Sequence, residues 1–116
     1  MCHVLIIEDE MLVALHLELM LLEHGATSFA FAETEAEAVE LALTQAPDII
    51  LSDVRLRRGT GPKAVQTILS EVGHRPVIFI TGTPEECEPC DPPHRVFGKP
   101  IHEPTIAAAF REMAPV

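Results

Sequence analysis

Short apolar runs alternate along the chain with longer segments in which apolar residues recur at helical spacing, and this alternation limits the fold more than any other feature. A run of four or five apolar residues is too short for a helix and is typical of a buried strand. The expected strands are Val4–Ile7, Thr27–Ala32, Ile49–Ser52, Val77–Thr81 and Arg95–Phe97. The expected helices are Met11–Glu23, Thr34–Gln45, Lys63–Val72 and Pro104–Met113. Strands that alternate with helices form a parallel sheet covered on both faces.

The composition of the strands predicts their order in the sheet. The first, third and fourth strands are the most uniformly apolar and are therefore expected in the middle. The second strand contains polar residues and the fifth is short, so both suit the edges. This gives the order 2-1-3-4-5 of a flavodoxin-like α/β fold, a (βα)5 three-layer sandwich whose site lies at the carboxyl ends of the strands. Residues 1–116 are enough for one such domain.

The first expected helix has more apolar residues than one buried face requires. Four leucines recur at helical spacing and are expected to be mostly core: Leu12, Leu15, Leu19 and Leu22. Val13, Leu17 and Met20 widen that stripe. We therefore expect the helix to bury more than one side, with a partner-facing surplus as the alternative.

The segment Gly82–Gly98 is rich in proline and has room for one short helical piece at most. It contains Cys87 and Cys90 in a C-x-x-C pattern. A redox pair of the thioredoxin type would open a helix after a strand, and a zinc site would need two further ligands, for which His94 is the nearest candidate. We therefore expect two unpaired loop cysteines.

Composition limits the partners and the compartment. The net charge of −10 disfavours nucleic acid or an anionic membrane as a direct partner. The apolar runs fall far short of the roughly 20 residues of a membrane helix. The start Met1–Val4 has no basic region of a signal peptide, and three cysteines do not suggest a secreted disulfide framework. A cytoplasmic protein is expected.

Polar residues follow the central strands at the points where these strands end. Glu8, Asp9 and Glu10 follow the first strand, and Asp53 follows the third. Because the carboxyl ends of parallel strands meet at one edge of the sheet, these carboxylates should lie close together and repel one another. A hard divalent cation resolves that repulsion, and a site built only from oxygen atoms suits Mg²⁺, or Mn²⁺ in its place.

The same edge should hold the groups that phosphoryl transfer requires. A carboxylate can act as a nucleophile toward phosphorus and form an aspartyl phosphate. Such a transfer depends on positioning and on neutralising charge with a metal ion, a lysine and a hydroxyl group. Thr81 ends the fourth strand and Lys99 follows the fifth, which completes that set.

Four motifs carry a family resemblance: LIIEDE, ILSDVRLRRGTG, VIFITGT and FGKP. In their order and spacing, over nearly the whole chain, the sequence resembles a two-component response-regulator receiver domain. The resemblance implies that Asp53 is the phosphoacceptor. It also implies that Asp9 binds the metal directly, Glu8 through water, and Arg55 through its backbone carbonyl, together with Asp53.

By the same resemblance, Thr81 would bond a phosphoryl oxygen and Lys99 would pair with it, and Lys99–Pro100 would be a cis peptide. Val96 stands where many receivers have an aromatic residue that rotates on activation. The backbone of Gly82–Gly98 is therefore expected to move instead. The usual readout surface is thus altered, whereas the phosphotransfer residues match the family.

The resulting interpretation is a stand-alone receiver that catalyses only its own phosphorylation and dephosphorylation and is not an enzyme in the ordinary sense. A histidine kinase or phosphotransfer protein would supply the phosphoryl group, and contacts with an unknown downstream protein would carry the signal. Homodimer formation stays open. Two alternatives are a phosphorylation-independent interaction module and a Mg²⁺-dependent phosphatase, for which Glu10 or Glu85 would have to act as general acid.

Three arginines lie just after Asp53, at Arg55, Arg57 and Arg58. Such a cluster is ordinarily a solvated loop. The alternative is that its local field steers an acidic phosphodonor toward Asp53.

Overall fold

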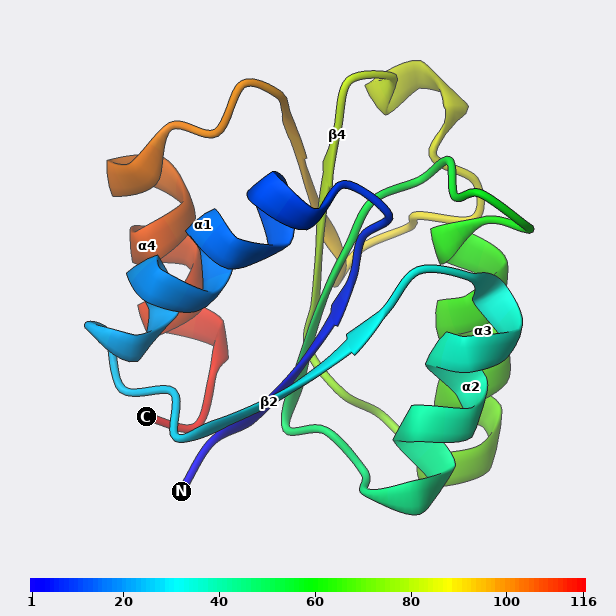
Figure 1. Cartoon of the computed structure of the whole chain (residues 1–116), viewed down its shortest axis with the longest axis horizontal. Helices are drawn as coiled ribbons and strands as arrows, with labels where there is room; N and C mark the ends of the chain where they lie inside the picture. Colours follow the sequence, from blue (N-terminus) through cyan, green and yellow to red (C-terminus); the bar gives the residue numbers. More distant parts are fainter.

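Five parallel strands form one sheet in the order β2-β1-β3-β4-β5 in the computed structural model, which describes residues 1–116 (Figure 1). The strands are β1 (His3–Ile7), β2 (Ser28–Ala32), β3 (Ile49–Ser52), β4 (Val77–Thr81) and β5 (Arg95–Gly98). All four neighbouring pairs are parallel. The order and the flavodoxin-like fold predicted from the sequence are confirmed.

Two helices cover each face of the sheet. They are α1 (Met11–Leu22), α2 (Glu35–Thr44), α3 (Gly61–Val72) and α4 (Glu103–Met113). Figure 1 shows α1 and α4 on one side of the sheet and α2 and α3 on the other. One apolar cluster lies beneath each pair of helices, so the core has two halves separated by the sheet. None of the helices combines the length and the apolar composition that crossing a bilayer requires.

Burial along the strands follows their place in the sheet. Every residue of β1, β3 and β4 is buried, whereas β2 and β5 are mostly half-buried. A strand covered by helices on both faces is mostly apolar, because each buried polar group needs a hydrogen-bond partner. The polar residues of these strands, His3, Ser52 and Thr81, stand only at strand ends. The uniform apolar runs in the sequence therefore marked the central strands correctly.

Side-chain caps set where α2 and α3 begin. The backbone N–H of Glu37 donates to Thr34 Oγ1 (3.1 Å), one half of a capping box. The Glu37 carboxylate in turn accepts from the backbone N–H of Glu33 (2.7 Å), one residue before Thr34, whose N–H is the donor in a capping box. Thr60 Oγ1 accepts from the backbone N–H of Lys63 (3.3 Å), so α3 begins at Gly61.

The prediction that the leucine stripe of α1 lies mostly in the core is wrong. Leu12 is 81% exposed and Leu19 57% exposed, and Leu15 and Leu22 are also exposed. The buried residues of α1 are Ala14, Leu17, Met20 and Leu21. Both faces of α1 are apolar, so helical spacing alone could not tell which face packs on the sheet. The alternative, that α1 has more apolar residues than its buried face needs, is therefore correct, and the additional leucines face solvent.

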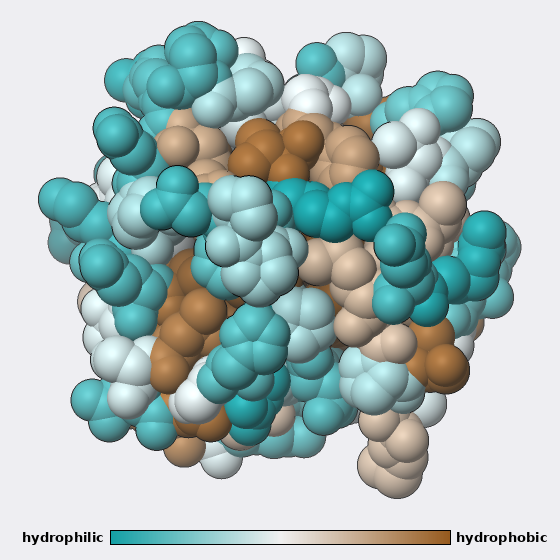
Figure 2. Space-filling view, turned by 180° about the vertical axis from the view of Figure 1, so that it is seen from behind, coloured by the Kyte–Doolittle hydropathy of each residue, from teal (hydrophilic) through white to brown (hydrophobic).

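Apolar exposure elsewhere is more dispersed. Met11 of α1 is also exposed, and Phe31 of β2 lines one hollow with Met11 and Leu15. The exposed side chains of Leu43 and Val116 lie on other parts of the chain. On the face shown in Figure 2, apolar residues form separate patches among polar ones. The α1 leucines are thus the main concentration of exposed apolar side chains.

The chain between β4 and β5 has a single turn of 3-10 helix, η1 (Pro84–Glu86), which confirms the expected short helical piece. Cys87 and Cys90 form a disulfide, so the expectation of unpaired cysteines is wrong. Their Cα atoms are 5.6 Å apart, a separation that a disulfide spans and that the spacing of two intervening residues does not reveal. The Lys99–Pro100 peptide is cis, as the resemblance implied.

Candidate functional site

The polar residues that end the strands meet at one edge of the sheet. Ile7 of β1 lies beside Ser52 of β3, so the next residues, Glu8 and Asp53, are neighbours. The backbone N–H of Asp53 donates to the carbonyl of Ile7 (2.8 Å), which extends the strand pairing to the site itself. The strand pairing thus brings Glu8 and Asp53 together at the predicted edge.

Lys99 connects three of these carboxylates. Its Nζ lies 2.9 Å from Asp53 Oδ2, 3.1 Å from Glu8 Oε1 and 3.2 Å from Glu10 Oε1. The β4–β5 pairing places Lys99 there, because Gly98 lies beside Thr81 and the N–H of Lys99 donates to the Thr81 carbonyl (2.8 Å). One positive charge among three carboxylates leaves the site negative. The site is thus suited to a further cation.

Burial changes the protonation of this cluster. Burial raises the pKa of Glu8 to about 7, and the charge of Asp53 adds to that rise, against the hydrogen bond from the N–H of Glu10 and the charge of Lys99. Burial alone would lower the pKa of Lys99, but the hydrogen bond to Asp53 and the charge of Glu8 outweigh it and raise that pKa. Lys99 therefore stays positively charged, and Glu8 is the carboxyl group whose charge depends on its surroundings.

Asp53 is 7% exposed and is held by hydrogen bonds on both carboxylate oxygens. The backbone N–H of Val54 donates to Oδ1 (2.6 Å), while Lys99 binds Oδ2. Ser52 Oγ donates to the Asp53 carbonyl oxygen (2.7 Å). A Cβ at residue 61 would overlap that carbonyl oxygen, so only glycine lets the start of α3 approach this closely. The backbone around Asp53 is thereby fixed.

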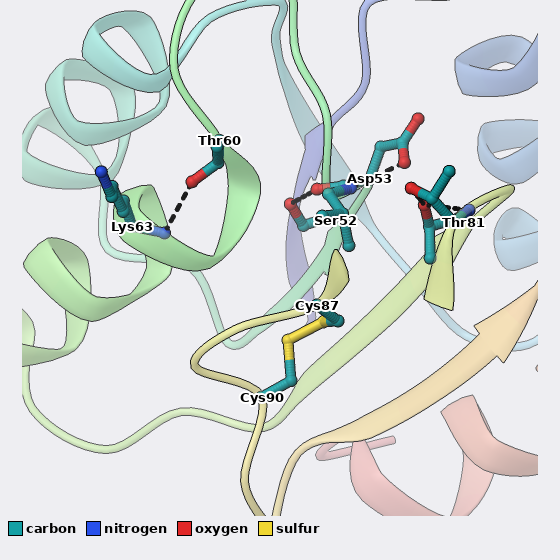
Figure 3. The surroundings of a disulfide bond; sticks show 9 residues. Ser52, Asp53, Thr60, Lys63, Thr81, Cys87 and Cys90 are labelled. Carbon is teal, nitrogen blue, oxygen red and sulfur yellow. Dashed lines mark hydrogen bonds between the residues drawn. A yellow bond between two sulfur atoms is a disulfide. The ribbon is translucent and has the colours of Figure 1, made fainter. Parts of the chain in front are cut away.

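Thr81 is buried at the end of β4, and its hydroxyl contacts the following loop. The backbone N–H of Thr83 donates to Thr81 Oγ1 (3.0 Å), and the two threonine hydroxyls lie 3.2 Å apart. Figure 3 shows Thr81 near the Asp53 carboxylate at the same edge of the sheet. Thr81 thus links the site to the segment between β4 and β5.

The carboxylate oxygens that could hold a cation come from Glu8, Glu10 and Asp53, which lie within 4.8 Å of one another. Asp9, which the resemblance assigned as a direct ligand, is half-buried and lies outside this group. Sequence reasoning missed Glu10 as a partner of Lys99, although the run of three acids after β1 was a signal. The set is made of oxygen donors only, as Mg²⁺ and Mn²⁺ prefer.

The arginines after Asp53 lie on an exposed loop. Arg55 Nε lies 3.5 Å from Glu86 Oε1 in the segment between β4 and β5, and Arg57 lies 3.4 Å from Glu33 after β2. Arg58 is exposed. The charges of Arg55 and Arg57 are therefore partly neutralised by these ion pairs, whereas Arg58 forms none.

Comparison with known proteins is consistent with this geometry. Residues 4–89 match the family model of the response regulator receiver domain. The chain is 35% identical over 113 residues to the phyllosphere-induced regulator PhyR of Methylorubrum extorquens, covering 94% of this chain and 42% of that protein. It is 38% identical over 78 residues to the transcriptional regulatory protein PdtaR of Mycobacterium tuberculosis, covering 67% of this chain and 38% of that protein.

Solved structures agree in fold. The solution structure of the receiver domain of Erythrobacter litoralis PhyR has a TM-score of 0.86 at 33% identity, with 97% of this chain and 88% of that chain covered. The crystal structure of the anti-anti-sigma factor PhyR from Bartonella quintana has a TM-score of 0.79 at 33% identity, with 97% and 46% covered. The chain spans less than half the length of the full-length relatives named here. It belongs to the response regulator receiver domain family.

Proposed function

We propose that this receiver accepts a phosphoryl group on Asp53 from a phosphohistidine of a histidine kinase or phosphotransfer protein, in a Mg²⁺-dependent reaction in the cytoplasm. The observation that carries the proposal is the 2.9 Å contact between Lys99 Nζ and a buried Asp53 carboxylate that has acidic neighbours. A half-buried lysine and a buried carboxylate at the carboxyl edge of a sheet provide a charge partner and a nucleophile at one point.

The metal would be held by Asp53, by Asp9 directly, by Glu8 through water and by the backbone carbonyl of Arg55. Glu10 lies close enough to Asp53 to contribute a further oxygen. When bound, the ion would neutralise charge on the phosphoryl oxygens and reduce the repulsion between the carboxylates. Mn²⁺ would serve in the same way, because it shares the preference for oxygen ligands.

The chain's own residues account for the remaining steps. A carboxylate oxygen of Asp53 attacks phosphorus in line, the phosphorus–nitrogen bond of the donor breaks, and the donor imidazole keeps the electron pair. Lys99 pairs with a phosphoryl oxygen while still close to Glu8. Thr81 would turn from Thr83 to donate its hydroxyl hydrogen to another phosphoryl oxygen. That exchange of partners transmits the event to the segment after β4.

The output would be a protein–protein contact. In this interpretation the partner surface comprises the end of β4, the segment Gly82–Gly98 and α4. The relative from Bartonella quintana is described as an anti-anti-sigma factor, a function carried out through binding to another protein. A protein target is therefore the natural output for this receiver as well.

Beryllofluoride, a phosphoryl mimic, tests the proposal. With Mg²⁺, we expect it to shift the backbone NMR signals of Val54, Thr81 and Lys99 in the wild type and to leave Asp53→Asn unchanged. Absence of shifts in the wild type would favour a phosphorylation-independent module. Steady release of phosphate from acetyl phosphate, many turnovers per protein per minute, would favour a phosphatase instead.

A further inference from the structure

The segment 82–94, here called the proline-rich segment, is weakly joined to the rest of the molecule. Its backbone-to-backbone hydrogen bonds, such as Cys87 N–H to the Pro84 carbonyl and His94 N–H to the Asp91 carbonyl, all stay within the segment. Only Thr83, at its start, bonds to β4, through Thr81 Oγ1. One exposed ion pair, between Glu86 and Arg55, connects it to another loop. Because no hydrogen bond joins residues 84–94 to the core, this part of the segment can open locally, and its position depends on a few side chains.

The Cys87–Cys90 disulfide is the main apolar anchor of this segment. Both cysteines are half-buried and pack against the apolar cluster beneath α2 and α3. A second, smaller anchor is the ring of His94, which meets Phe79 of β4 edge-on with centroids 6.0 Å apart. Figure 3 shows the disulfide below Ser52 and Asp53, where the segment passes the sheet. The cross-link thus covers part of the core where the chain forms no full helix.

The disulfide is also accessible to small reagents. A hollow of about 630 Å³ is lined by Cys87, Cys90 and Val96, among others. A further hollow of about 270 Å³ separates the proline-rich segment from Val65 and Leu69 of α3. The third cysteine, Cys2, is 1% exposed in the core and cannot take part. Access and loose packing on both sides distinguish Cys87 and Cys90 from a sealed structural disulfide.

The proline-rich segment is joined directly to two residues of the candidate site. It starts immediately after Thr81, whose hydroxyl contacts Thr83, and it runs into β5, which ends beside Lys99. Any change in how the segment is anchored therefore reaches the groups that would hold a phosphoryl oxygen.

We propose that Cys87 and Cys90 are a reversible thiol–disulfide site that sets the mobility of the proline-rich segment and, through it, the response of the receiver. The oxidant is a low-molecular-weight disulfide of the glutathione type. One cysteine thiolate attacks a sulfur of that disulfide and releases the first thiolate; the second cysteine thiolate then attacks the mixed disulfide and releases the other. The two cysteines lose two electrons and two protons, and the small disulfide becomes two thiols. A dithiol reverses the reaction.

The closed disulfide holds the segment against the core and limits its movement, whereas the open dithiol frees it. Only the link to phosphorylation rests on the proposed function; the redox reaction and its effect on mobility do not.

The first test equilibrates the whole chain with mixtures of reduced and oxidised glutathione, traps free thiols by alkylation and locates them by mass spectrometry. We expect Cys87 and Cys90 to change together and reversibly, and Cys2→Ser to behave like the wild type. Two thiols at positions 87 and 90 that still alkylate after equilibration with oxidised glutathione alone would overturn the proposal.

The second test compares amide hydrogen exchange in the oxidised and reduced protein. We expect amides of residues 85–91 to exchange about tenfold faster or more after reduction, with β1, β3 and β4 unchanged. The double variant Cys87→Ser/Cys90→Ser should exchange its amides at the rates of the reduced protein, and adding a dithiol should not change them. Equal exchange in both redox states would contradict the proposed anchoring.

A third comparison separates the two proposals. Asp53→Asn should retain the redox reaction and the change in exchange while losing its response to beryllofluoride. In the wild type, the beryllofluoride-induced shifts of residues 82–94 should be larger in the reduced protein. Equal shifts in both redox states, with the shift of Val54 still present, would refute the coupling and leave the proposed function intact.

Discussion

Lys99 and Glu8 show most directly how burial shapes the candidate site. Lys99 Nζ contacts carboxylates from three positions, yet Glu8 is 4% exposed and its pKa is raised to about 7 from an ordinary value of 4.5. A carboxyl group whose pKa is higher in the folded state favours folding when it is protonated. Its stabilising contribution is complete below pH 4.5 and is lost as the pH rises through about 7.

The substitution Glu8→Gln tests this in metal-free protein. Glutamine has nearly the shape of the protonated acid, so the variant should match the wild type near pH 4, where the Glu8 carboxyl is mostly protonated in both the folded and the unfolded protein. Near pH 8 its free energy of unfolding, from urea denaturation in a chelator, should exceed that of the wild type by about 1–3 kcal/mol. A variant that is less stable than the wild type at pH 8 would contradict the assigned cost of the Glu8 charge.

Asp9 and Glu10 are alternative candidates for a carboxylate ligand of the metal. Family resemblance assigns the metal to Asp9, while the geometry groups Glu10 with Glu8 and Asp53. We predict that Asp9→Asn weakens Mg²⁺ binding by tenfold or more, about 1.4 kcal/mol, because it removes a charged ligand. Glu10→Gln, a matched loss of one charge at an exposed side chain, should weaken it less. Calorimetric or NMR titration with Mg²⁺ gives both constants; the reverse ranking would assign the metal to Glu10.

At the scale of elements, α1 is the helix whose packing the sequence did not determine. Leu17 is 3% exposed and belongs to the core beneath α1 and α4, whereas Leu19, two residues later, is 57% exposed. Truncating a buried leucine removes apolar contacts and leaves a cavity, but truncating an exposed one removes little.

Leu17→Ala should therefore lower the free energy of unfolding by about 2–5 kcal/mol, and Leu19→Ala by less than about 0.5 kcal/mol. Both variants lose the same atoms from the same helix, so each is the control for the other. Chemical denaturation measures both values. Equal losses would mean that the leucine stripe is buried in solution, for example in a homodimer.

How far the sequence predicts the structure also differs between elements. Ile49–Ser52 and Val77–Thr81 were bounded correctly because each is a run of apolar residues that ends at its first polar residue, Ser52 or Thr81. The sequence could not predict which side of α1 is buried, because both faces of the helix are apolar. The Cys87–Cys90 pairing could not be read either, because it depends on how a proline-rich loop turns.

The candidate site was predicted by the same logic as the strands. Asp53, Thr81 and Lys99 follow from where their strands end, because a parallel sheet gathers those ends. Glu10 and Thr83 were missed as partners of Lys99 and Thr81. Their roles depend on side-chain directions that strand ends do not determine.

At the scale of the whole molecule, a net charge of −10 repels anionic phosphodonors. Arg58 lies on the loop after Asp53, while Arg111 lies in the last turn of α4. Arg58→Glu and Arg111→Glu change the net charge equally but at different places. We predict that Arg58→Glu slows phosphorylation by acetyl phosphate at low ionic strength by about twofold or more, and that salt removes the difference. Equal rates for the two variants at low salt would exclude local steering.

The fold places one buried carboxylate, Asp53, beside Lys99 and two further acids. In the proposed function a divalent cation binds there, and mass spectrometry of the intact protein tests that claim most directly. After incubation with acetyl phosphate and Mg²⁺, we expect the wild type to gain the mass of one phosphoryl group. Asp53→Asn, and the wild type with a chelator in place of Mg²⁺, should gain none. A phosphoryl group that appears on Asp53→Asn, or equally fast without a divalent cation, would contradict the account.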